Sequence, residues 1–202
     1  MLAALALILT AGVATSLTGL TVYRLSMGTA YASFALLSVA LLLGPWNVLR
    51  GRPNPVSTHL RRDVGIWAAL MALAHTVFGL QVHIPGRPWQ YFLWPFDQQR
   101  LFPLRYDAAG AANHPGLVSM LILLLLLALS SDAALRRLGA PRWKSLQRWN
   151  YAAFLMMSFH AVIYQLLEKR SPPVMALFAI AVMIVVAVQV AGWRRRRAGN
   201  KR

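Results

Sequence analysis

The sequence contains no cysteine. This absence excludes disulfides, iron–sulfur clusters and thiolate zinc sites, because all of them need this side chain. It also excludes covalent attachment of a c-type haem, which needs a Cys-x-x-Cys-His segment. Any prosthetic group bound by this chain would therefore be held by coordination and packing alone.

Acidic residues are almost as scarce, with only five in 202 residues. All of them lie near the ends of apolar runs rather than inside them. Proton pumps and ion-coupled transporters usually bury carboxylates in the bilayer, so the pattern does not favour these classes. The chain also has no P-loop and no dinucleotide fingerprint. A flavin- or nicotinamide-dependent donor would therefore be another chain. The five acids are Asp63, Asp97, Asp107, Asp132 and Glu168.

Apolar residues dominate what is present: 58% of the residues are hydrophobic and 13% are charged. A soluble domain would carry about a quarter charged residues. The apolar residues form runs of about 20 residues, the length that spans a bilayer. We therefore predict one all-α transmembrane domain over residues 1–202, a polytopic bundle of about six helices. The expected spans are 1–23, 29–49, 64–83, 115–131, 149–167 and 174–193.

The first run could instead be a signal peptide, but it lacks a basic n-region and is longer than a typical h-region, so a true span is expected. Fifteen of the 21 Lys and Arg residues follow the second, fourth and sixth runs. The positive-inside rule makes that side cytoplasmic, together with both termini. We expect a multi-pass protein of a bacterial inner membrane, in contact with the lipid bilayer. The net charge of +16 is explained by these flanking positions, and nucleic acid is not an expected partner.

The connection over residues 84–113 then lies on the outer side and is rich in aromatic residues. Such rings settle at the bilayer interface, so a belt or short surface helix is one interpretation. A cover over a cofactor, or a docking surface, is the other. The aromatic residues are Trp89, Tyr91, Phe92, Trp94, Phe96, Phe102 and Tyr106.

Two of the five histidines, His75 and His160, lie well inside apolar runs. Each lies 12 residues after a charged residue at the start of its run, Asp63 or Arg148, and both runs leave the basic side. At 1.5 Å per residue, each imidazole is roughly 18 Å above that start. Two imidazoles at equal depth on parallel helices have the arrangement needed to clamp one porphyrin iron from both faces.

The neighbours of these histidines at helical spacing are small or apolar. Ala68, Ala72 and Gly79 would let a flat macrocycle approach the backbone near His75. Ala68 and Ala72 also fit a plain helix–helix interface, in which each histidine is only an interhelical hydrogen-bonding residue. Zinc is less favoured than haem, because two histidines lack its usual third and fourth ligands.

The remaining candidates have simple alternative explanations. His83 and His114 end the third run and precede the fourth, where interfacial solvation competes with a quinone, metal or haem-propionate contact. His59 lies in a basic loop and is expected to be solvated. Arg61 and Arg62 fit topological anchoring, or binding of an anionic headgroup, a flavin phosphate or a haem propionate.

Two segments resemble a known family. One runs from Arg61 to Trp67, Arg-Arg-Asp-Val-Gly-Ile-Trp, and is followed by His75. The other runs from Leu135 to Tyr151, with Arg-Arg-Leu-Gly and spaced Trp, Leu and Tyr residues, and is followed by His160. Both are similar to ferric-reductase-like transmembrane proteins, most closely to the haem-binding membrane subunits of periplasmic methionine-sulfoxide reductase systems.

The resemblance implies six helices, b haem on His75 and His160, and electron delivery to a periplasmic redox partner. The family commonly has another histidine thirteen residues before the position of His160, where this chain has Gln147. We therefore expect one haem b per chain, with electrons from the quinone pool or from an FMN held near Arg61 and Arg62. The expected function is that of an electron-transfer subunit of a membrane oxidoreductase. A cofactor-free small transporter or scaffold subunit is the alternative.

Overall fold

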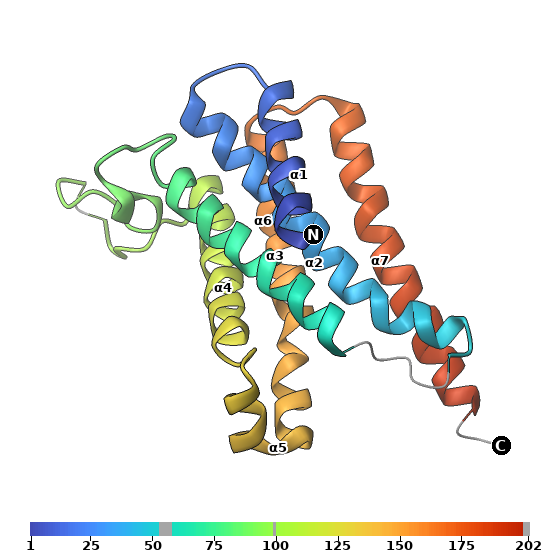
Figure 1. Ribbon diagram of the computed structural model, residues 1–202. Coiled ribbons are helices and arrows are strands. Elements are labelled where there is room, and N and C mark those ends of the chain that lie inside the picture. The colour runs from blue at the N-terminus through green and yellow to red at the C-terminus, as the bar shows by residue number, and fades with distance from the viewer. Residues whose placement is uncertain (53–57, 99, 200–202) are drawn as a thin grey trace.

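The computed structural model describes residues 1–52, 58–98 and 100–199. These residues form seven α-helices, one short 3₁₀ helix and no strand beyond an isolated bridge between Leu93 and Leu104. The long helices run between two ends of an elongated bundle (Figure 1). The elements are α1 (Leu2–Ser16), α2 (Thr21–Leu49), α3 (Thr58–Gly79), η1 (Pro88–Tyr91), α4 (Ala108–Ala128), α5 (Asp132–Gln147), α6 (Trp149–Leu167) and α7 (Pro172–Gly199).

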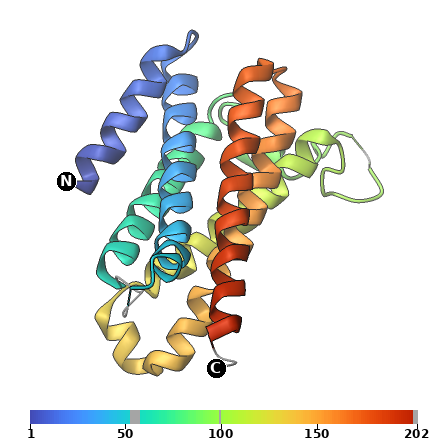
Figure 2. The same cartoon turned by 90° about the vertical axis from the view of Figure 1, so that its right-hand side faces the viewer.

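Three of the described helices, α2, α4 and α7, are long and apolar enough to cross a membrane. The helices α3 and α6 lie alongside them in the bundle (Figures 1 and 2) but carry more polar residues, including His75 and His160. The prediction of an all-α membrane protein is therefore confirmed. The count of six spans goes beyond what helix length and composition alone support.

The first expected span, residues 1–23, is not one helix. The helix α1 has 15 residues and ends at Ser16, so at 1.5 Å per residue it covers about 22 Å, less than the bilayer core. It packs against α2 so closely that a Cβ on Gly28 would lie 2.5 Å from the Thr10 carbonyl oxygen. Met1 consequently lies part-way along the bundle, while α7 ends at the far lower end (Figures 1 and 2).

The helix α2 begins eight residues earlier than the expected second span, at Thr21. It thereby includes Arg24, which the sequence placed in a loop. The Arg24 Nε donates a hydrogen bond to the carbonyl oxygen of Ala14, near the C-terminus of α1, at 2.6 Å. A free carbonyl at a helix end accepts this charged donor, so the helix tolerates it.

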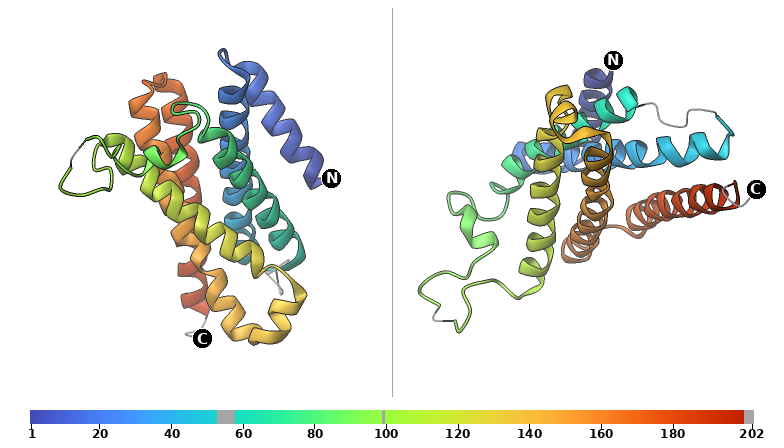
Figure 3. Two further views of the ribbon diagram at one scale, coloured as in Figure 1. Left: turned by 90° about the vertical axis from the view of Figure 1, so that its left-hand side faces the viewer. Right: turned by 90° about the horizontal axis from the view of Figure 1, so that it is seen from below.

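The basic segment after α4 is a helix rather than the expected loop. Ser131 caps α5, its side chain accepting from the Ala134 backbone N–H at 3.1 Å. The helical path breaks at Gly139, where φ is +71°, a backbone conformation that favours glycine. This bent helix forms the lower end of the bundle between α4 and α6 (Figure 3).

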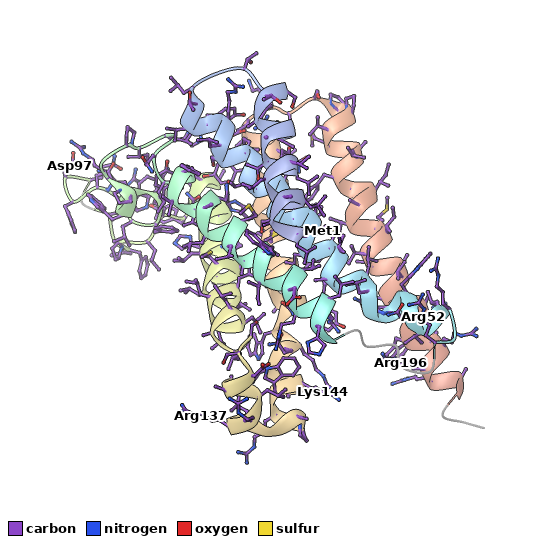
Figure 4. All side chains as sticks on the ribbon, viewed as in Figure 1. Met1, Arg52, Asp97, Arg137, Lys144 and Arg196 are labelled. Atoms are coloured by element: carbon purple, nitrogen blue, oxygen red, sulfur yellow. The ribbon has the colours of Figure 1, made fainter. Side chains whose placement is uncertain are left out.

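Charge is distributed unequally between the two ends. Arg52, Arg137, Lys144 and Arg196 all lie toward the lower end (Figure 4). Asp97 lies on the connection at the opposite end (Figure 4). We call these the basic end and the outer end. Lys201 and Arg202, two of the basic residues used to predict orientation, lie outside the described residues.

The core lies between α2, α3, α4, α6 and α7 and is made of small and aliphatic side chains with a phenylalanine cluster. The Phe34 ring stacks on Phe154 with centroids 5.6 Å apart and lies 4.6 Å from the centroid of Phe178. This cluster joins α2 and α7 to α6, the helix that carries His160.

Candidate functional site

His75 lies in α3 and faces α2. Its Nδ1 is 2.9 Å from the backbone carbonyl oxygen of Ser26 and 3.2 Å from the Ser26 hydroxyl. Because a carbonyl oxygen can only accept, Nδ1 carries the proton and donates it. The free lone pair is then on Nε2, the nitrogen that can bind a metal.

His160 lies in α6 and has the same arrangement against α4. Its Nδ1 is 3.0 Å from the carbonyl oxygen of Ala112, so this ring also donates from Nδ1 and leaves Nε2 free. Gly116 makes the close approach of α4 possible. A Cβ at this position would lie 2.6 Å from His160 Nδ1, closer than atoms that are not bonded can come.

The two imidazoles lie together, with ring centroids 6.1 Å apart and planes at 72°. A metal held between two imidazole nitrogens lies about 2.0–2.1 Å from each, and each nitrogen lies about 1.1 Å from its ring centre. The expected separation of the centroids is then about 6 Å. The observed centroid separation of 6.1 Å is close to this value.

Both histidines line a largely apolar cavity of about 190 Å³ between α2, α3, α4 and α6. Its walls carry aromatic and flexible side chains such as Phe34, Met120 and Met157. Methionine adapts to irregular shapes, and phenylalanine offers a large flat apolar surface, so these walls suit a large apolar ligand. We call this space the outer cavity.

A polar network lines the outer end of this cavity. The Tyr164 hydroxyl donates to Asn113 Oδ1 at 2.8 Å, and its ring lies 4.9 Å from that of His160. The Asn113 Nδ2 donates to the Tyr91 carbonyl at 3.0 Å. The Tyr91 hydroxyl in turn donates to the Gly79 carbonyl at 3.0 Å. The network therefore ties the outer connection to α3, α4 and α6 around the histidine pair.

His83 belongs to a second polar group, which lines the outer cavity at its mouth, near the outer end of the bundle. Its Nε2 lies 3.6 Å from Glu168 Oε1, and its ring stacks on Tyr164 with centroids 6.4 Å apart. Glu168 also accepts from Arg170 at 2.6 Å and from the Tyr23 hydroxyl at 3.3 Å. Burial alone would lower the pKa of Arg170, but Glu168 and the neighbouring tyrosines outweigh it and raise that pKa. The carboxylate and guanidinium therefore form a charged pair beside the cavity.

A ferric reductase-like transmembrane component model matches residues 29–158 of the chain. The chain belongs to the ferric reductase-like transmembrane family. The matched range includes His75 and ends two residues before His160. No curated protein matches the chain. Domains of this family are generally redox-active and associated with haem, so the chain is a membrane redox component.

The residues of this ferric reductase-like domain fit a haem held by two histidines. Both Nδ1 atoms are engaged by backbone carbonyls, both Nε2 atoms are left free, and the glycine at position 116 leaves room for the His160 ring. Within the described ranges, no three His, Asp or Glu side chains gather as a metal site of their own. A two-ligand site needs the remaining coordination from the cofactor, as a porphyrin provides.

Arg61 and Arg62 are not part of the outer cavity. They line a separate space of about 300 Å³ near the basic end, which we call the inner cavity. Arg62 pairs with Asp132 at the start of α5 and lies 4.0 Å from Asp63. Gln147, at the position where the resemblance implied a further histidine, lines the same space.

The other predicted histidines have different outcomes. His59 is exposed, as expected. Of the interpretations left open for His114, solvation does not hold for Nε2, which is buried and lacks a hydrogen-bond partner among the described residues. Its Nδ1 is 2.6 Å from the Gly110 carbonyl oxygen, and its ring packs edge-on against Phe92 with centroids 6.1 Å apart.

The aromatic connection combines both of its predicted interpretations. Tyr91 is buried, and together with Phe92 it lines the outer cavity, so this part covers the site. Phe96 and Phe102 are exposed, as interfacial rings would be. No pattern in the sequence points to Glu168 or Asn113, because their role depends on which turns the helices bring together.

Proposed function

We propose that this protein is a membrane b-type cytochrome, in which His75 and His160 hold one haem. The observation that carries the proposal is the pair of imidazoles with centroids 6.1 Å apart, each donating from Nδ1 to a carbonyl of a neighbouring helix. The protein would act as the electron-transfer subunit of a membrane oxidoreductase.

When bound, the haem supplies reversible one-electron chemistry at its iron. The chain supplies the rest. The carbonyls of Ser26 and Ala112 fix the tautomer and rotation of the two rings and make each Nε2 a stronger ligand. The apolar walls, including Phe34 and Met157, exclude water and hold the site at low dielectric, which tunes the reduction potential.

The surroundings of the outer cavity support electron transfer toward the outer side. His83, Glu168 and Arg170 lie at its mouth and offer polar contacts to a quinol headgroup or to a redox partner. We propose the quinone pool as donor and a periplasmic protein as acceptor, as in the haem subunits of sulfoxide reductase systems. A flavin phosphate held by Arg61 and Arg62 is the second possible donor.

We also propose the topology that follows from the basic end. With this end cytoplasmic in a bacterial inner membrane, α2, α3, α4, α6 and α7 cross the bilayer, and the C-terminus of α7 is cytoplasmic. The helix α1 would enter from the outer end without crossing. This topology replaces the first expected span, residues 1–23, with a helix that does not cross, and it does not keep the cytoplasmic assignment of the N-terminus.

The test is the reduced-minus-oxidised absorption spectrum of detergent-purified protein, with a haem-to-chain ratio. We expect a low-spin b-type spectrum near one haem per chain. His75→Ala and His160→Ala should each lose the haem or convert it to a high-spin form. His59→Ala, which alters an exposed histidine, should retain the wild-type spectrum.

Colourless wild-type protein, after expression with ample haem, would reject this proposal in favour of a transporter or scaffold. About two haems per chain would show that the inner cavity also holds one, without a histidine at position 147.

A further inference from the structure

The inner cavity has a chemical character that the haem proposal does not use. Five cationic side chains line it, contributed by α3, α5, α7 and the junction between α5 and α6, and no acidic side chain of the described residues does. Its deeper wall is apolar and is formed by α2, α3 and α4. The cations are Arg61, Arg62, Lys144, Arg148 and Arg196, and the apolar wall includes Ala40, Ala69, Leu123, Leu126 and Leu127.

Most of this positive charge has no acidic partner. Within the part of the chain that the structure describes, Arg62 is the one cation of the five in an ion pair, with Asp132 and Asp63. Like charges gathered around one cavity repel each other, and a bound anion would remove that repulsion. Arginine is suited to this purpose because its planar fork donates two parallel hydrogen bonds to phosphate oxygens.

Two buried donors at the same cavity also lack hydrogen-bond partners. The Nε2 of Gln147 and the Nε of Arg62 are buried, and neither makes a hydrogen bond within the described residues, although the Arg62 Nε lies 4.0 Å from Asp63 Oδ1. Buried polar groups in folded proteins are almost always paired. Two such donors beside one cationic cavity indicate an acceptor-rich ligand in their neighbourhood.

We propose that the inner cavity binds an anionic phospholipid, with its phosphate among the arginines and an acyl chain against the leucines of α4. Basic cavities between transmembrane helices on the cytoplasmic side bind anionic lipid headgroups in this way. A lipid accounts for the cationic side and the apolar wall together. A soluble phosphate would leave the apolar wall unmatched. The proposal does not depend on haem at the histidine pair.

The first experiment needs no variant. Delipidated protein is titrated with dioleoyl phosphatidylglycerol and, separately, with dioleoyl phosphatidylcholine, and bound lipid is counted by native mass spectrometry. We expect one phosphatidylglycerol per chain, bound at least about tenfold more tightly than phosphatidylcholine. Equal binding of the two lipids would overturn the proposal.

The second experiment compares charge-matched variants. The double variant Arg61→Gln/Arg148→Gln removes two cations from the inner cavity, whereas Arg136→Gln/Arg137→Gln removes two exposed cations of α5 that do not line it. The first should lower the affinity for phosphatidylglycerol at least about tenfold and the second less than about twofold. Equal losses would show a general attraction to the basic end and reject a specific site.

A third titration uses FMN in place of lipid. Tight FMN binding that displaces phosphatidylglycerol and depends on Arg61 and Arg148 would reassign the cavity from lipid to flavin. The haem spectrum is recorded on every sample. Neither arginine lines the outer cavity, so a normal spectrum with lost lipid binding separates this proposal from the haem proposal.

Discussion

The outer and inner cavities are built from some of the same helices but have opposite chemical character. The outer cavity holds two imidazoles whose Nδ1 atoms are paired with backbone carbonyls, and its polar mouth contains a paired carboxylate and guanidinium. The inner cavity has cations in excess and orphaned donors. If both proposals hold, one bundle would carry a haem site at one level and an anion site at another. The difference lies in whether each polar group finds its partner within the chain.

The strongest test of this comparison substitutes one glycine in each cavity. In Gly116→Ala the new Cβ would lie 2.6 Å from His160 Nδ1, so the ring must move and loses its carbonyl partner. We expect haem affinity to fall roughly 10- to 100-fold, the usual cost of losing a ligand's supporting contact. Gly65→Ala, in the inner cavity, meets nothing within 4 Å and should retain haem. Equal haem loss in both variants would contradict a specific role for Gly116.

The next effect concerns the network at the mouth of the outer cavity. Tyr164→Phe removes the donor to Asn113 Oδ1 and leaves that buried oxygen unpaired. The free energy of unfolding should fall by about 1–3 kcal/mol. Thermal unfolding in detergent measures it, with Tyr151→Phe as control, because Tyr151 is exposed and its bond to Gln189 is long, at 3.4 Å. A similar loss of stability in both variants would show that the hydrogen bond from Tyr164 to Asn113 contributes no more than an exposed one.

A smaller effect is expected at the start of α4. Asp107 caps this helix by accepting from the Gly110 N–H at 2.9 Å, and it pairs with Arg105. Asp107→Ala should lower the free energy of unfolding by about 1 kcal/mol.

Hydrogen bonding from Arg105, then from Gly110, holds the pKa of Asp107 below its ordinary value. The contribution of the Asp107 carboxylate to the free energy of unfolding is therefore complete above about pH 4. It is lost as the pH falls through the lowered pKa. Asp107→Asn should flatten stability over that acid range, and an unchanged slope would refute this.

The smallest effect is expected at Ser26, where the variant distinguishes the contact of His75 with the backbone carbonyl from its contact with the side-chain hydroxyl. Ser26→Ala removes the hydroxyl 3.2 Å from His75 Nδ1 but keeps the carbonyl at 2.9 Å. Haem affinity should change only about two- to threefold, because the principal hydrogen bond survives. A tenfold loss would show that the hydroxyl is the true partner of His75.

Sequence reasoning brought His75 and His160 to one depth because hydropathy marks where each run begins and helical rise is constant. It could not identify the carbonyls of Ser26 and Ala112, since every residue has a carbonyl and only packing selects one. It also missed α5, whose glycine, proline and basic residues are typical of loops. It overestimated the first span because residues 17–20, between two apolar helices, are themselves uncharged.

Leu123 of α4 lines both cavities and is almost fully buried, with 2% of its surface exposed. It stands between spaces that lie toward opposite ends of the bundle. In a membrane that stores an electrochemical gradient, this side chain would be a barrier to the passage of water and protons between the two spaces. Leu123→Ala would join the two spaces and admit water between them. Vesicles carrying that variant should leak protons faster than wild-type vesicles, although neither histidine has changed.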